Sequence, residues 1–445
     1  MKRNKTPNMS RRSFLHKTAT TGAGIVAIPY LSLGASAVEK PLTRVLGRTG
    51  AEITTFGLGG QASLQWTPGD VNPTEIIAKA VDLGVTYFDT SNVYDGSQIN
   101  YGKAFRAIGL APGRANYDEK KRRGIFVASK TMLRYARGNR TGMVSFSNGP
   151  AGSTAVDDLK RSLSQVFGDG NGNYPNGAYF DIFQMHNLTA PADVDAIYEG
   201  LHEDNPERVG ALAAILDYRD GTNRTGFNPK EEKLVRHIGI SGHHSSPLLI
   251  DCIQRDDKEI IDTLLVATNA NDRRYQNHQH NVLPVAAAKG LGIIGMKVFA
   301  DGAMYTKGAH WTRGPQEVVR SIGSSALPSE ALIQYALSLP GVATTIIGIG
   351  HIDTDRERCQ LEQNIAATRL PDPLDESRRQ EIEGLAMRAK EGQTNWYQKP
   401  AEPLSPPQAP SVTQEVRGDK LVVKLAWHTA SAGEDPISHY EVLRD

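Results

Sequence analysis

Four ionisable side chains stand at or just beyond the ends of short apolar segments of this chain. Asp89 ends the segment Val85–Asp89, and Tyr94 follows it by five residues. Lys130 and His186 stand at the ends of two later segments of the same kind. If these segments are neighbouring parallel strands, their carboxyl ends meet at one rim, and the four side chains share one site.

Together these groups could place a proton on an oxygen atom. A carboxylate keeps a neighbouring ammonium charged, and an ammonium lowers the pKa of a nearby phenol, so Asp89 and Lys130 could tune Tyr94 toward proton donation near neutral pH. His186 would then orient a carbonyl group. Since no side chain can supply the hydride that must reach the adjoining carbon, the set implies a nicotinamide cofactor.

The body of the chain, from about residue 51 to 365, repeats an apolar run, a polar turn and a segment of helical periodicity. Eight runs are expected as strands: Thr54–Gly59, Val85–Asp89, Ile125–Ser129, Asp181–His186, Val235–Ser241, Thr263–Asn269, Leu291–Lys297 and Thr344–Gly350. Eight buried strands that alternate with helices predict an α/β fold of the (β/α)8 type, a TIM barrel. No G-x-G-x-x-G opens the first crossover, which argues against a doubly wound dinucleotide-binding sheet.

The barrel domain is expected to cover residues 38–400. Helices are expected between the strands, for example at Pro73–Leu83, Ser153–Phe167, Ala190–Leu201, Gln279–Lys289 and Pro328–Leu339, and a closing helix at Pro371–Lys390. Two insertions, Arg134–Gly152 and Asp217–Glu231, interrupt the repeat at positions where connecting loops would lie. Because such loops form the sites of barrels, the insertions are candidate pocket walls. Trp66, in the loop after the first strand, is another.

The composition is that of a globular protein with a large core. The 445 residues are 39% hydrophobic and 22% charged, with a mean hydropathy of −0.39, which excludes wholesale disorder and a multi-span membrane protein. Cys252 and Cys359 cannot form a disulfide framework, an iron–sulfur centre or a cysteine-rich zinc site. The formal net charge is +1, and the basic count gives no reason to propose a nucleic-acid partner.

Residues 1–37 differ from the rest of the chain because they hold six basic and no acidic residues, so that the remainder has 44 basic and 49 acidic residues. The sequence SRRSFLHK at Ser10–Lys17, a mildly apolar run and the triplet Ala35–Ala37 resemble a twin-arginine export signal cleaved after Ala37. An uncleaved anchor is the alternative, but the run is short and weakly hydrophobic for a span of about 20 residues. We therefore expect a periplasmic or extracellular protein with no integral membrane span after signal removal.

The last part of the chain has a different character. Residues 401–410 are rich in proline and predict an extended linker. Residues 411–445 alternate like strands, carry Trp427 and Tyr440, and resemble the first half of a fibronectin type III module. A complete module needs about 90 to 100 residues, so we expect a partial sandwich with unpaired edges or a truncated module. Such a segment could dock a protein partner.

The barrel segments carry further motifs in a recognisable order. LGRTG at Leu46–Gly50, GVTYFDTSNVYDGSQINYGKAF at Gly84–Phe105, the Lys of FVASK, the His of FQMHN and HIGIS at His237–Ser241 resemble the aldo-keto reductase family. The resemblance spans about residues 42–365 and includes all four ionisable residues, Asp89, Tyr94, Lys130 and His186. It implies that these four are catalytic, with Tyr94 as general acid in carbonyl reduction and as general base in the reverse reaction.

The resemblance also implies contacts to the nicotinamide half of a cofactor. Ser241 and Asn269 would hold the carboxamide, and Gly60 would allow a close backbone approach. The chain departs from the family where glycine replaces the usual asparagine after Ser241, and where Met296 and Lys297 replace the usual tyrosine and serine. Lys297 can instead be interpreted as a pyrophosphate contact. Ser241 and Asn269 could also merely cap a helix or satisfy a loop.

The stretch IGIGHIDTDRERCQLEQNIAA resembles the adenosine-binding part of the family. By this resemblance Gln363 and Asn364 would contact the cofactor, Asn364 at the adenine. Arg356 and Arg358 could clamp a 2′-phosphate, since guanidinium groups suit phosphate oxygens, which favours NADP, with NAD possible. Pairing with neighbouring acidic residues is the default alternative for both arginines.

A metal site is a further alternative that we do not expect. His186, His243 and His244 together with Asp89 could in principle surround a divalent ion. Such sites bring several carboxylates to one ion, whereas these strand ends offer a single Asp and Lys130 as a competing counter-ion.

The sequence therefore predicts an exported NAD(P)H-dependent oxidoreductase that reduces an aldehyde, a ketone or an open-chain sugar. The rival function is a nicotinamide-binding sensor or interaction subunit with little turnover, and a metal-dependent isomerase or lyase is the third alternative. Because free NADPH is scarce outside the cytoplasm, an exported enzyme is expected to release its cofactor slowly.

Overall fold

The computed structural model describes residues 40–138, 146–321, 323–370, 372–390 and 405–428, and the further positions 430, 437 and 440–443. The expected export signal at 1–37 lies outside the described residues, as do 139–145 of the first insertion and 401–404 of the expected linker. In the described part of the chain, no helix combines the length and the apolar character that crossing a bilayer requires.

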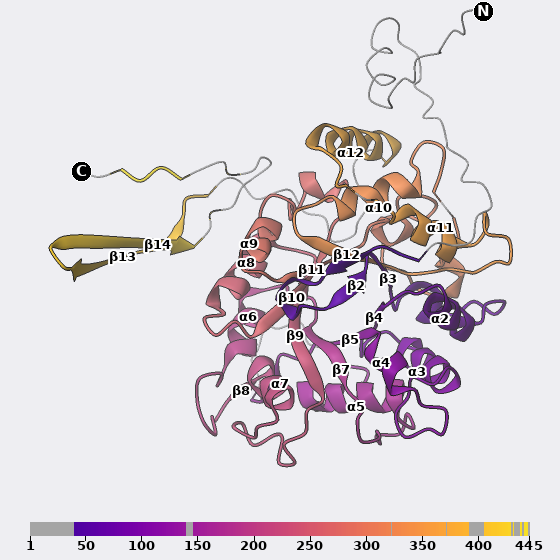
Figure 1. Cartoon of the computed structure of the whole chain (residues 1–445), viewed down its shortest axis with the longest axis horizontal. Coiled ribbons are helices and arrows are strands. Elements are labelled where there is room, and N and C mark those ends of the chain that lie inside the picture. Colours follow the sequence, from indigo (N-terminus) through magenta and orange to yellow (C-terminus); the bar gives the residue numbers. More distant parts are fainter. Residues whose placement is uncertain are drawn as a thin grey trace, which may run out of the picture. The chain divides into compact units, whose positions relative to one another are not determined.

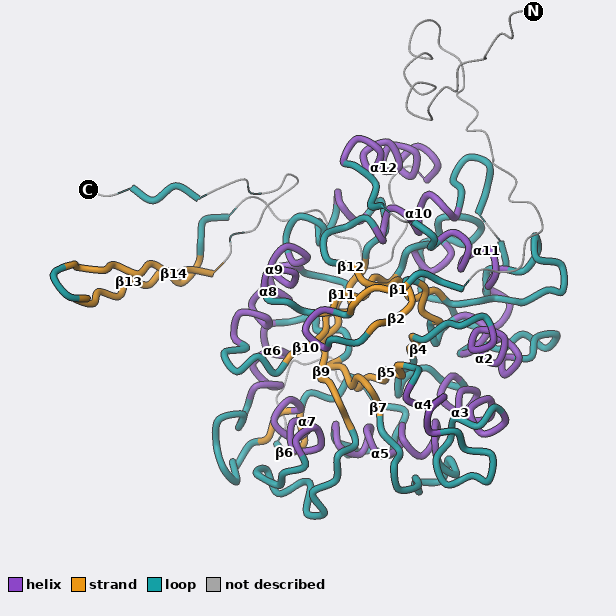
Figure 2. The backbone as a smooth tube through the Cα atoms, in the orientation of Figure 1, coloured by secondary structure: helices purple, strands orange, loops and turns teal. Residues whose placement is uncertain are grey.

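Eight parallel strands close a barrel in the order β3, β4, β5, β7, β9, β10, β11, β12 (Figures 1 and 2). Their bounds are β3 Phe56–Leu58, β4 Tyr87–Asp89, β5 Phe126–Thr131, β7 Phe180–Met185, β9 Val235–Gly242, β10 Ile261–Ala267, β11 Gly292–Met296 and β12 Val342–Ile347. Each strand coincides with one of the eight expected segments, which confirms the (β/α)8 prediction. Since neighbouring strands are all parallel, their carboxyl ends share one rim.

Helices form a layer around the barrel (Figure 1). They are α2 Pro73–Asp82, α3 Ser97–Ala107, α4 Glu119–Arg123, α5 Ala155–Phe167, α6 Pro191–Tyr198, α7 Ala211–Asp220, α8 Ser246–Arg255, α9 Val282–Ala288, α10 Ser329–Leu337, α11 Gln360–Ala367 and α12 Glu376–Lys390. The last of these is the expected closing helix, and it begins five residues later than the sequence pattern predicts.

The starts of the helices follow from polar caps in the sequence. The Asn72 side chain accepts a hydrogen bond from the Thr74 backbone N–H ahead of α2, whose first residue is Pro73. At α5, the Thr154 hydroxyl and the Asp157 carboxylate form a reciprocal capping box. These caps end the preceding loops and fix where each helix turns back along the barrel.

A short hairpin contributes side chains to the core inside the barrel. Its strands are β1 Thr43–Val45 and β2 Glu52–Thr54, and Leu46 and Ile53 belong to the same buried cluster as the barrel residue Ile182. Gly47 has φ of +48°, and a Cβ there would lie 2.2 Å from the Gly292 backbone nitrogen. The LGRTG motif therefore needs its first glycine because the turn packs directly on the start of β11.

The two-residue alternation of the strands brings polar groups into the interior of the barrel at the carboxyl rim. Ala128 and Ile182 pack together inside the barrel, and Lys130 and Gln184 lie two residues further along the same strands, paired in register. Asp89 pairs in register with Ala128 on the other side. Because side chains two apart face the same way, Lys130 and Gln184 share the inner face of the barrel.

The two predicted insertions have defined structures where they are described. In the first, β6 Tyr135–Arg137 pairs with β8 Val209–Gly210. In the second, the Asp217 carboxylate accepts hydrogen bonds from the Thr222 and Thr225 hydroxyls, which folds the loop back on α7. The described residues of these insertions do not line the cavity reported below, so their expected role as pocket walls stays a prediction.

The C-terminal segment forms a hairpin of β13 Gln408–Arg417 and β14 Lys420–His428, joined through Gly418 at φ of +65°. Strand β13 begins inside the segment expected as a linker. The Trp427 and Tyr440 rings lie 5.4 Å apart between centroids, and the Tyr440 hydroxyl accepts a hydrogen bond from the Ala430 backbone N–H. The strands agree with the predicted alternation, while the resemblance to a fibronectin type III module stays a prediction.

Candidate active site

The structure brings the four predicted catalytic residues together at the carboxyl rim. Lys130 is fully buried and donates hydrogen bonds to Asp89 Oδ1 at 2.5 Å and to the Thr90 carbonyl at 2.7 Å. The same Nζ lies 4.9 Å from the Tyr94 ring centroid. The Tyr94 and His186 rings meet edge to face at 5.7 Å. Strand ends far apart in the sequence thus form one cluster, as the barrel prediction requires.

Burial disfavours the charged forms of both Asp89 and Lys130. It raises the pKa of Asp89 and lowers the pKa of Lys130, while the attraction between the two groups acts in the opposite direction on each. The nearby Lys297 lowers the pKa of Lys130 further. The ion pair is therefore held by the surrounding fold, and each partner offsets the cost of burying the other.

The pKa of Tyr94 corrects one expectation from the sequence. Burial raises it well above the usual value of a phenol, and the carboxylates of Asp89 and Asp301 raise it further. The expected net lowering of this pKa is overturned because burial and the two carboxylates dominate, while the Lys130 Nζ donates to Asp89 and Thr90 and lies 4.9 Å from the Tyr94 ring centroid. Tyr94 is thus a protonated phenol throughout the neutral range.

His186 is a neutral imidazole in this setting. Burial lowers its pKa well below the usual value, and the positive charges of Lys130, Arg134 and Lys297 lower it further. Its Nδ1 lies 3.1 Å from the Ser91 hydroxyl. A neutral ring carries one N–H and one lone pair, so it can donate a hydrogen bond to an oxygen without bringing a second cation next to Lys130.

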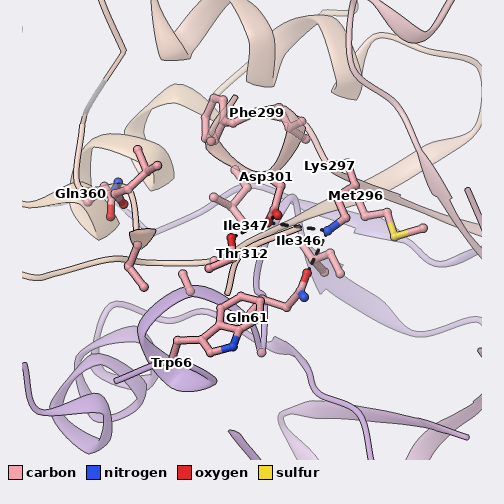
Figure 3. Close-up of a pocket in the computed structure, with 18 of the residues that line it drawn as sticks. Gln61, Trp66, Met296, Lys297, Phe299, Asp301, Thr312, Ile346, Ile347 and Gln360 are labelled. Atoms are coloured by element: carbon pink, nitrogen blue, oxygen red, sulfur yellow. Dashed lines mark hydrogen bonds and ion pairs between the residues drawn. The ribbon is translucent and has the colours of Figure 1, made fainter. Parts of the chain in front are cut away.

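A cavity that is partly open to solvent lies beside this cluster. Asp89 and Tyr94 line it at the catalytic end, and Gln360 lines it at the start of α11. Between them the walls come from the ends of β3, β11 and β12 and from residues 298–321 (Figure 3). The cavity therefore joins the catalytic cluster to the part of the chain that resembles an adenosine site.

Lys297 occupies the middle of this cavity wall, with its side chain 7% exposed. Its Nζ donates to Gln61 Oε1 at 3.0 Å and lies 3.8 Å from Asp301 Oδ1 (Figure 3). The same Nζ stands 5.1 Å from the Trp311 ring centroid. Asp301 also binds Lys307 at 2.8 Å. Burial lowers the pKa of Lys297, and Asp301 acts against that shift.

Sequence reasoning missed three of these partners. Gln61, Asp301 and Trp311 do not stand at strand ends, and their positions depend on the course of loops that no periodicity describes. One signal was present, since KVFADGAMYTK places Asp301 between two lysines. The backbone here is unusual, with φ of +56° at Lys297 and +58° at Asp301, a conformation that non-glycine residues adopt mainly where the fold requires it.

Gly60 lines the cavity as expected, but its close approach is to the protein itself. A Cβ at this position would lie 2.5 Å from the Asp89 carbonyl oxygen and 2.8 Å from both Ser97 Oγ and Thr90 Cα. Glycine is therefore required because the loop after β3 packs against the end of β4. The predicted contact of Gly60 with a cofactor stays a prediction.

Ser241 and Asn269 are engaged in loop structure instead of lining the cavity. The Ser241 hydroxyl accepts a hydrogen bond from the Asn187 backbone N–H at 2.9 Å. The Asn269 side chain binds Asp272 Oδ2 at 2.7 Å and accepts backbone hydrogen bonds from Asn271 and Asp272. Both side chains thus satisfy loops, which was the alternative interpretation from the sequence.

The predicted adenosine residues also have protein partners. Arg356 lies 3.0 Å from Glu362, and Arg358, 68% exposed, lies within 3.4 Å of two neighbouring aspartates. Gln363 donates to the Arg356 carbonyl, and Asn364 is buried in α11. In this structure the two arginines pair with acidic residues, which was their default alternative.

His243, which follows β9, and His278, in the loop between β10 and α9, are held by hydrogen bonds. His243 Nδ1 lies 2.8 Å from Asn187 Oδ1, and His278 Nδ1 lies 2.8 Å from the Ser246 hydroxyl. Burial lowers the pKa of His278 to about 4. Within the described ranges, no three histidine, cysteine, aspartate or glutamate side chains are grouped so that they could hold a metal ion.

The structure is a closed parallel barrel with a cluster of ionisable residues at the carboxyl ends of its strands, beside a cavity. Residues 55–386 match the model of the aldo/keto reductase family, so the chain belongs to that family of oxidoreductases.

Three relatives illustrate the similarity. An uncharacterized oxidoreductase of Bacillus subtilis (strain 168), YqkF, is 22% identical over 330 residues, which are 71% of this chain and 90% of the relative. The holo form of an aldo-keto reductase from Bacillus halodurans, AKR11C1, is 20% identical with a TM-score of 0.48, covering 77% of this chain and 95% of the other. An aldo/keto reductase from Klebsiella pneumoniae in complex with NADP and acetate is 15% identical with a TM-score of 0.46, covering 77% of this chain and 94% of the other.

Proposed function

We propose that the chain reduces an aldehyde, a ketone or an open-chain sugar with NADPH, with Tyr94 protonating the carbonyl oxygen. One observation carries this proposal: Tyr94, 8% exposed, lines the cavity while its ring contacts both Lys130 and His186. A carbonyl oxygen placed there would meet a protonated phenol and a neutral imidazole. Family membership supports the choice of an oxidoreductase.

The cavity suits an anionic dinucleotide. Its lining runs from Tyr94 to Gln360 of α11, and Lys297 provides a nearly buried cation in its wall. We infer that Lys297 would hold the phosphates and that Met296 and Trp66 would lie against the nicotinamide half. When bound, the nucleotide supplies the hydride that no side chain can provide.

The roles of the protein groups follow from their contacts. Tyr94 gives its proton to the carbonyl oxygen, and the Lys130 ammonium near its ring stabilises the negative charge that develops on the phenol oxygen. Asp89 keeps Lys130 charged in a buried place. His186 donates a hydrogen bond that orients the carbonyl.

NADP is our preferred nucleotide, with NAD as the alternative. Arg356 and Arg358 precede α11, in the stretch that resembles an adenosine site. Their present partners are carboxylates, and a 2′-phosphate would replace one anion by another. Guanidinium groups bind both kinds of anion in the same planar geometry.

The raised pKa of Tyr94 predicts the pH dependence. Reduction needs the protonated phenol, so its rate should stay constant across neutral pH and fall only above the usual range of tyrosine. Oxidation of an alcohol needs the phenolate, so its rate should rise steadily with pH. Steady-state rates in both directions between neutral and strongly alkaline pH would check this. A reduction rate that already falls near neutral pH would show that another group donates the proton.

The function itself is tested with purified protein, a panel of aldehydes, ketones and reducing sugars, and NADPH or NADH. The proposal expects loss of nicotinamide absorbance with at least one carbonyl and faster loss with NADPH. Binding of NADPH to wild type without turnover on any carbonyl would favour the sensor or interaction subunit. Activity that needs a divalent metal and no nucleotide would favour an isomerase or lyase and overturn the proposal.

We further propose that the chain is exported by the twin-arginine pathway with its nucleotide bound, and that the C-terminal segment docks a protein partner. The motif SRRSFLHK motivates the first statement. Replacing Arg11 and Arg12 by lysine should leave the protein in the cytoplasm, whereas wild type should appear outside it, shortened at Ala37. Export of the double variant, or rapid loss of nucleotide from the exported form on gel filtration, would contradict this proposal.

A further inference from the structure

Ser91 is a buried hydroxyl beside the catalytic cluster that the proposed mechanism does not use. It stands two residues after Asp89, in the turn that leads to Tyr94, and its side chain is fully buried. The Tyr94 backbone N–H donates to the Ser91 carbonyl. The Ser91 Oγ lies 3.1 Å from His186 Nδ1.

The polar groups around Ser91 Oγ and His186 Nδ1 show which of these two atoms donates the hydrogen bond. The Val93 backbone N–H points at Ser91 Oγ at 3.5 Å, so the oxygen has a donor of its own. Among the described residues, His186 Nδ1 is the acceptor within reach of the Ser91 hydroxyl hydrogen. If Nδ1 carried the ring proton, that buried hydrogen would have no acceptor, which is costly. The hydroxyl therefore donates to Nδ1.

The main chain around the imidazole is fixed by another buried group. Arg134 donates to the His186 carbonyl at 2.7 Å and to the Asn187 carbonyl at 2.8 Å. Asp193 pairs with the same guanidinium at 3.3 Å. Asn187 has φ of +54°, a conformation that these contacts hold in place. The backbone that carries His186 therefore cannot shift easily, and its Nδ1 stays at Ser91.

We propose that Ser91 is a positioning residue that fixes His186 as the Nε2–H tautomer, so that the carbonyl oxygen of the substrate accepts hydrogen bonds from both His186 and Tyr94. With Nδ1 occupied by Ser91, Nε2 is the ring nitrogen left for a substrate. The other tautomer would present a lone pair to the carbonyl oxygen and repel it. This inference rests on the proposed carbonyl reduction for its kinetic consequence, whereas the tautomer is a property of the protein alone.

The tautomer is measured directly by NMR on protein with ¹⁵N-labelled histidine, with the His186 signals assigned by their absence in His186→Asn. Wild type should show Nε2 protonated and Nδ1 as a hydrogen-bond acceptor across neutral pH. Ser91→Ala should show a mixture of both tautomers. A protonated Nδ1 in wild type would overturn the proposal, whether or not the variant folds and whether or not any carbonyl is reduced. The same tautomer in Ser91→Ala would overturn the assignment to Ser91.

Kinetics then test the consequence for the reaction. Ser91→Ala should lower kcat for carbonyl reduction by about tenfold, as expected for the loss of one hydrogen bond in the transition state, with NADPH affinity unchanged. Ser162→Ala is the matched control, because Ser162 is equally buried and its hydroxyl accepts from Gln98 in the layer outside the barrel. An equal loss in both variants would indicate a packing effect and contradict the proposal. Absence of turnover in wild type would refute the proposed function and leave the NMR result as it stands.

Discussion

Tyr94→Phe should lower kcat for carbonyl reduction by about 10³-fold, the range of a lost general acid. The substitution removes one oxygen and keeps the ring that packs against Lys130 and His186. No hydrogen bond joins the Tyr94 hydroxyl to another residue in the part of the chain that the structure describes, so folding should be unaffected. NADPH should bind to the variant with wild-type affinity because the change lies at the catalytic end of the cavity.

Two measurements make this result specific. Thermal unfolding should give the same Tm for Tyr94→Phe and wild type, which excludes loss of structure as the cause. Tyr101→Phe is the control, because Tyr101 is a fully buried tyrosine of α3 whose hydroxyl donates to the Leu58 carbonyl and which does not line the cavity. It should lose about 1 kcal/mol of stability and keep its turnover. Turnover retained in Tyr94→Phe would assign proton donation to another group and remove the basis of the proposed mechanism.

The catalytic cluster could be predicted from the sequence because two regularities fix it. Strand alternation places Lys130 and Gln184 on the inner face of the barrel, and parallel strands in a closed barrel bring their ends to one rim. Residue type at a strand end was therefore enough to place Asp89, Lys130 and His186 near one another. The pKa of Tyr94 could not be predicted in the same way. It depends on how completely loops cover the ring and on the carboxylate of Asp301, more than 200 residues away in the chain.

The predicted cofactor contacts stay predictions, and the side chains concerned have protein partners for a physical reason. Side chains of loops and helix starts compete for nearby backbone and charged groups, and local partners are usually satisfied first. Asn269 thus binds its own loop, and Arg356 pairs with Glu362. Lys297 directly follows a barrel strand and lines the cavity, while its predicted contact with the pyrophosphate stays a prediction. Asp89 and Lys130 could be placed from their strand ends, whereas the partners of Asn269 and Arg356 depend on local loop geometry.

The carboxylate of Asp301 is the counter-ion of two lysines at or near the cavity. It binds Lys307 at 2.8 Å and lies 3.8 Å from Lys297, and the two lysines lower its pKa. Lys297, which lines the cavity, therefore has a nearby carboxylate that reduces the cost of burying its ammonium. If Lys297 holds a phosphate as we propose, that phosphate would compete with Asp301 for the ammonium.

Lys130→Met should lose both stability and turnover, because it removes a proposed catalytic group and half of a buried ion pair. The Asp89 carboxylate would remain buried without its ammonium, and its Oδ2 already has no hydrogen-bond partner among the described residues. Removing one partner of a buried ion pair leaves the other charge uncompensated, which costs about 3–5 kcal/mol of stability. Turnover should fall by about 10²-fold or more, since no cation then stabilises the phenolate form of Tyr94.

The stability of Lys130→Met should depend on pH, and the pKa of Asp89 sets the direction of that dependence. Burial already raises the pKa of Asp89, and removal of Lys130 removes the attraction that acts against this shift. In Lys130→Met the folded state therefore favours the protonated carboxyl more than the unfolded chain does, so stability is greatest below the unfolded pKa and falls as pH rises toward the folded pKa. Urea unfolding of the variant should give a larger free energy at mildly acidic pH than at neutral pH.

The double variant Asp89→Asn/Lys130→Met separates the two contributions. It removes both charges, so no uncompensated carboxylate stays in the barrel. The double variant should therefore regain most of the stability, about 3–5 kcal/mol, that Lys130→Met loses. Turnover should stay as low as in Lys130→Met, because Tyr94 still lacks its cation. If the double variant were as unstable as the single one, packing of the lysine chain and not charge would explain the loss. If the double variant regained turnover, Lys130 would support catalysis only by keeping Asp89 neutralised, and the direct stabilisation of Tyr94 by its ammonium would be wrong.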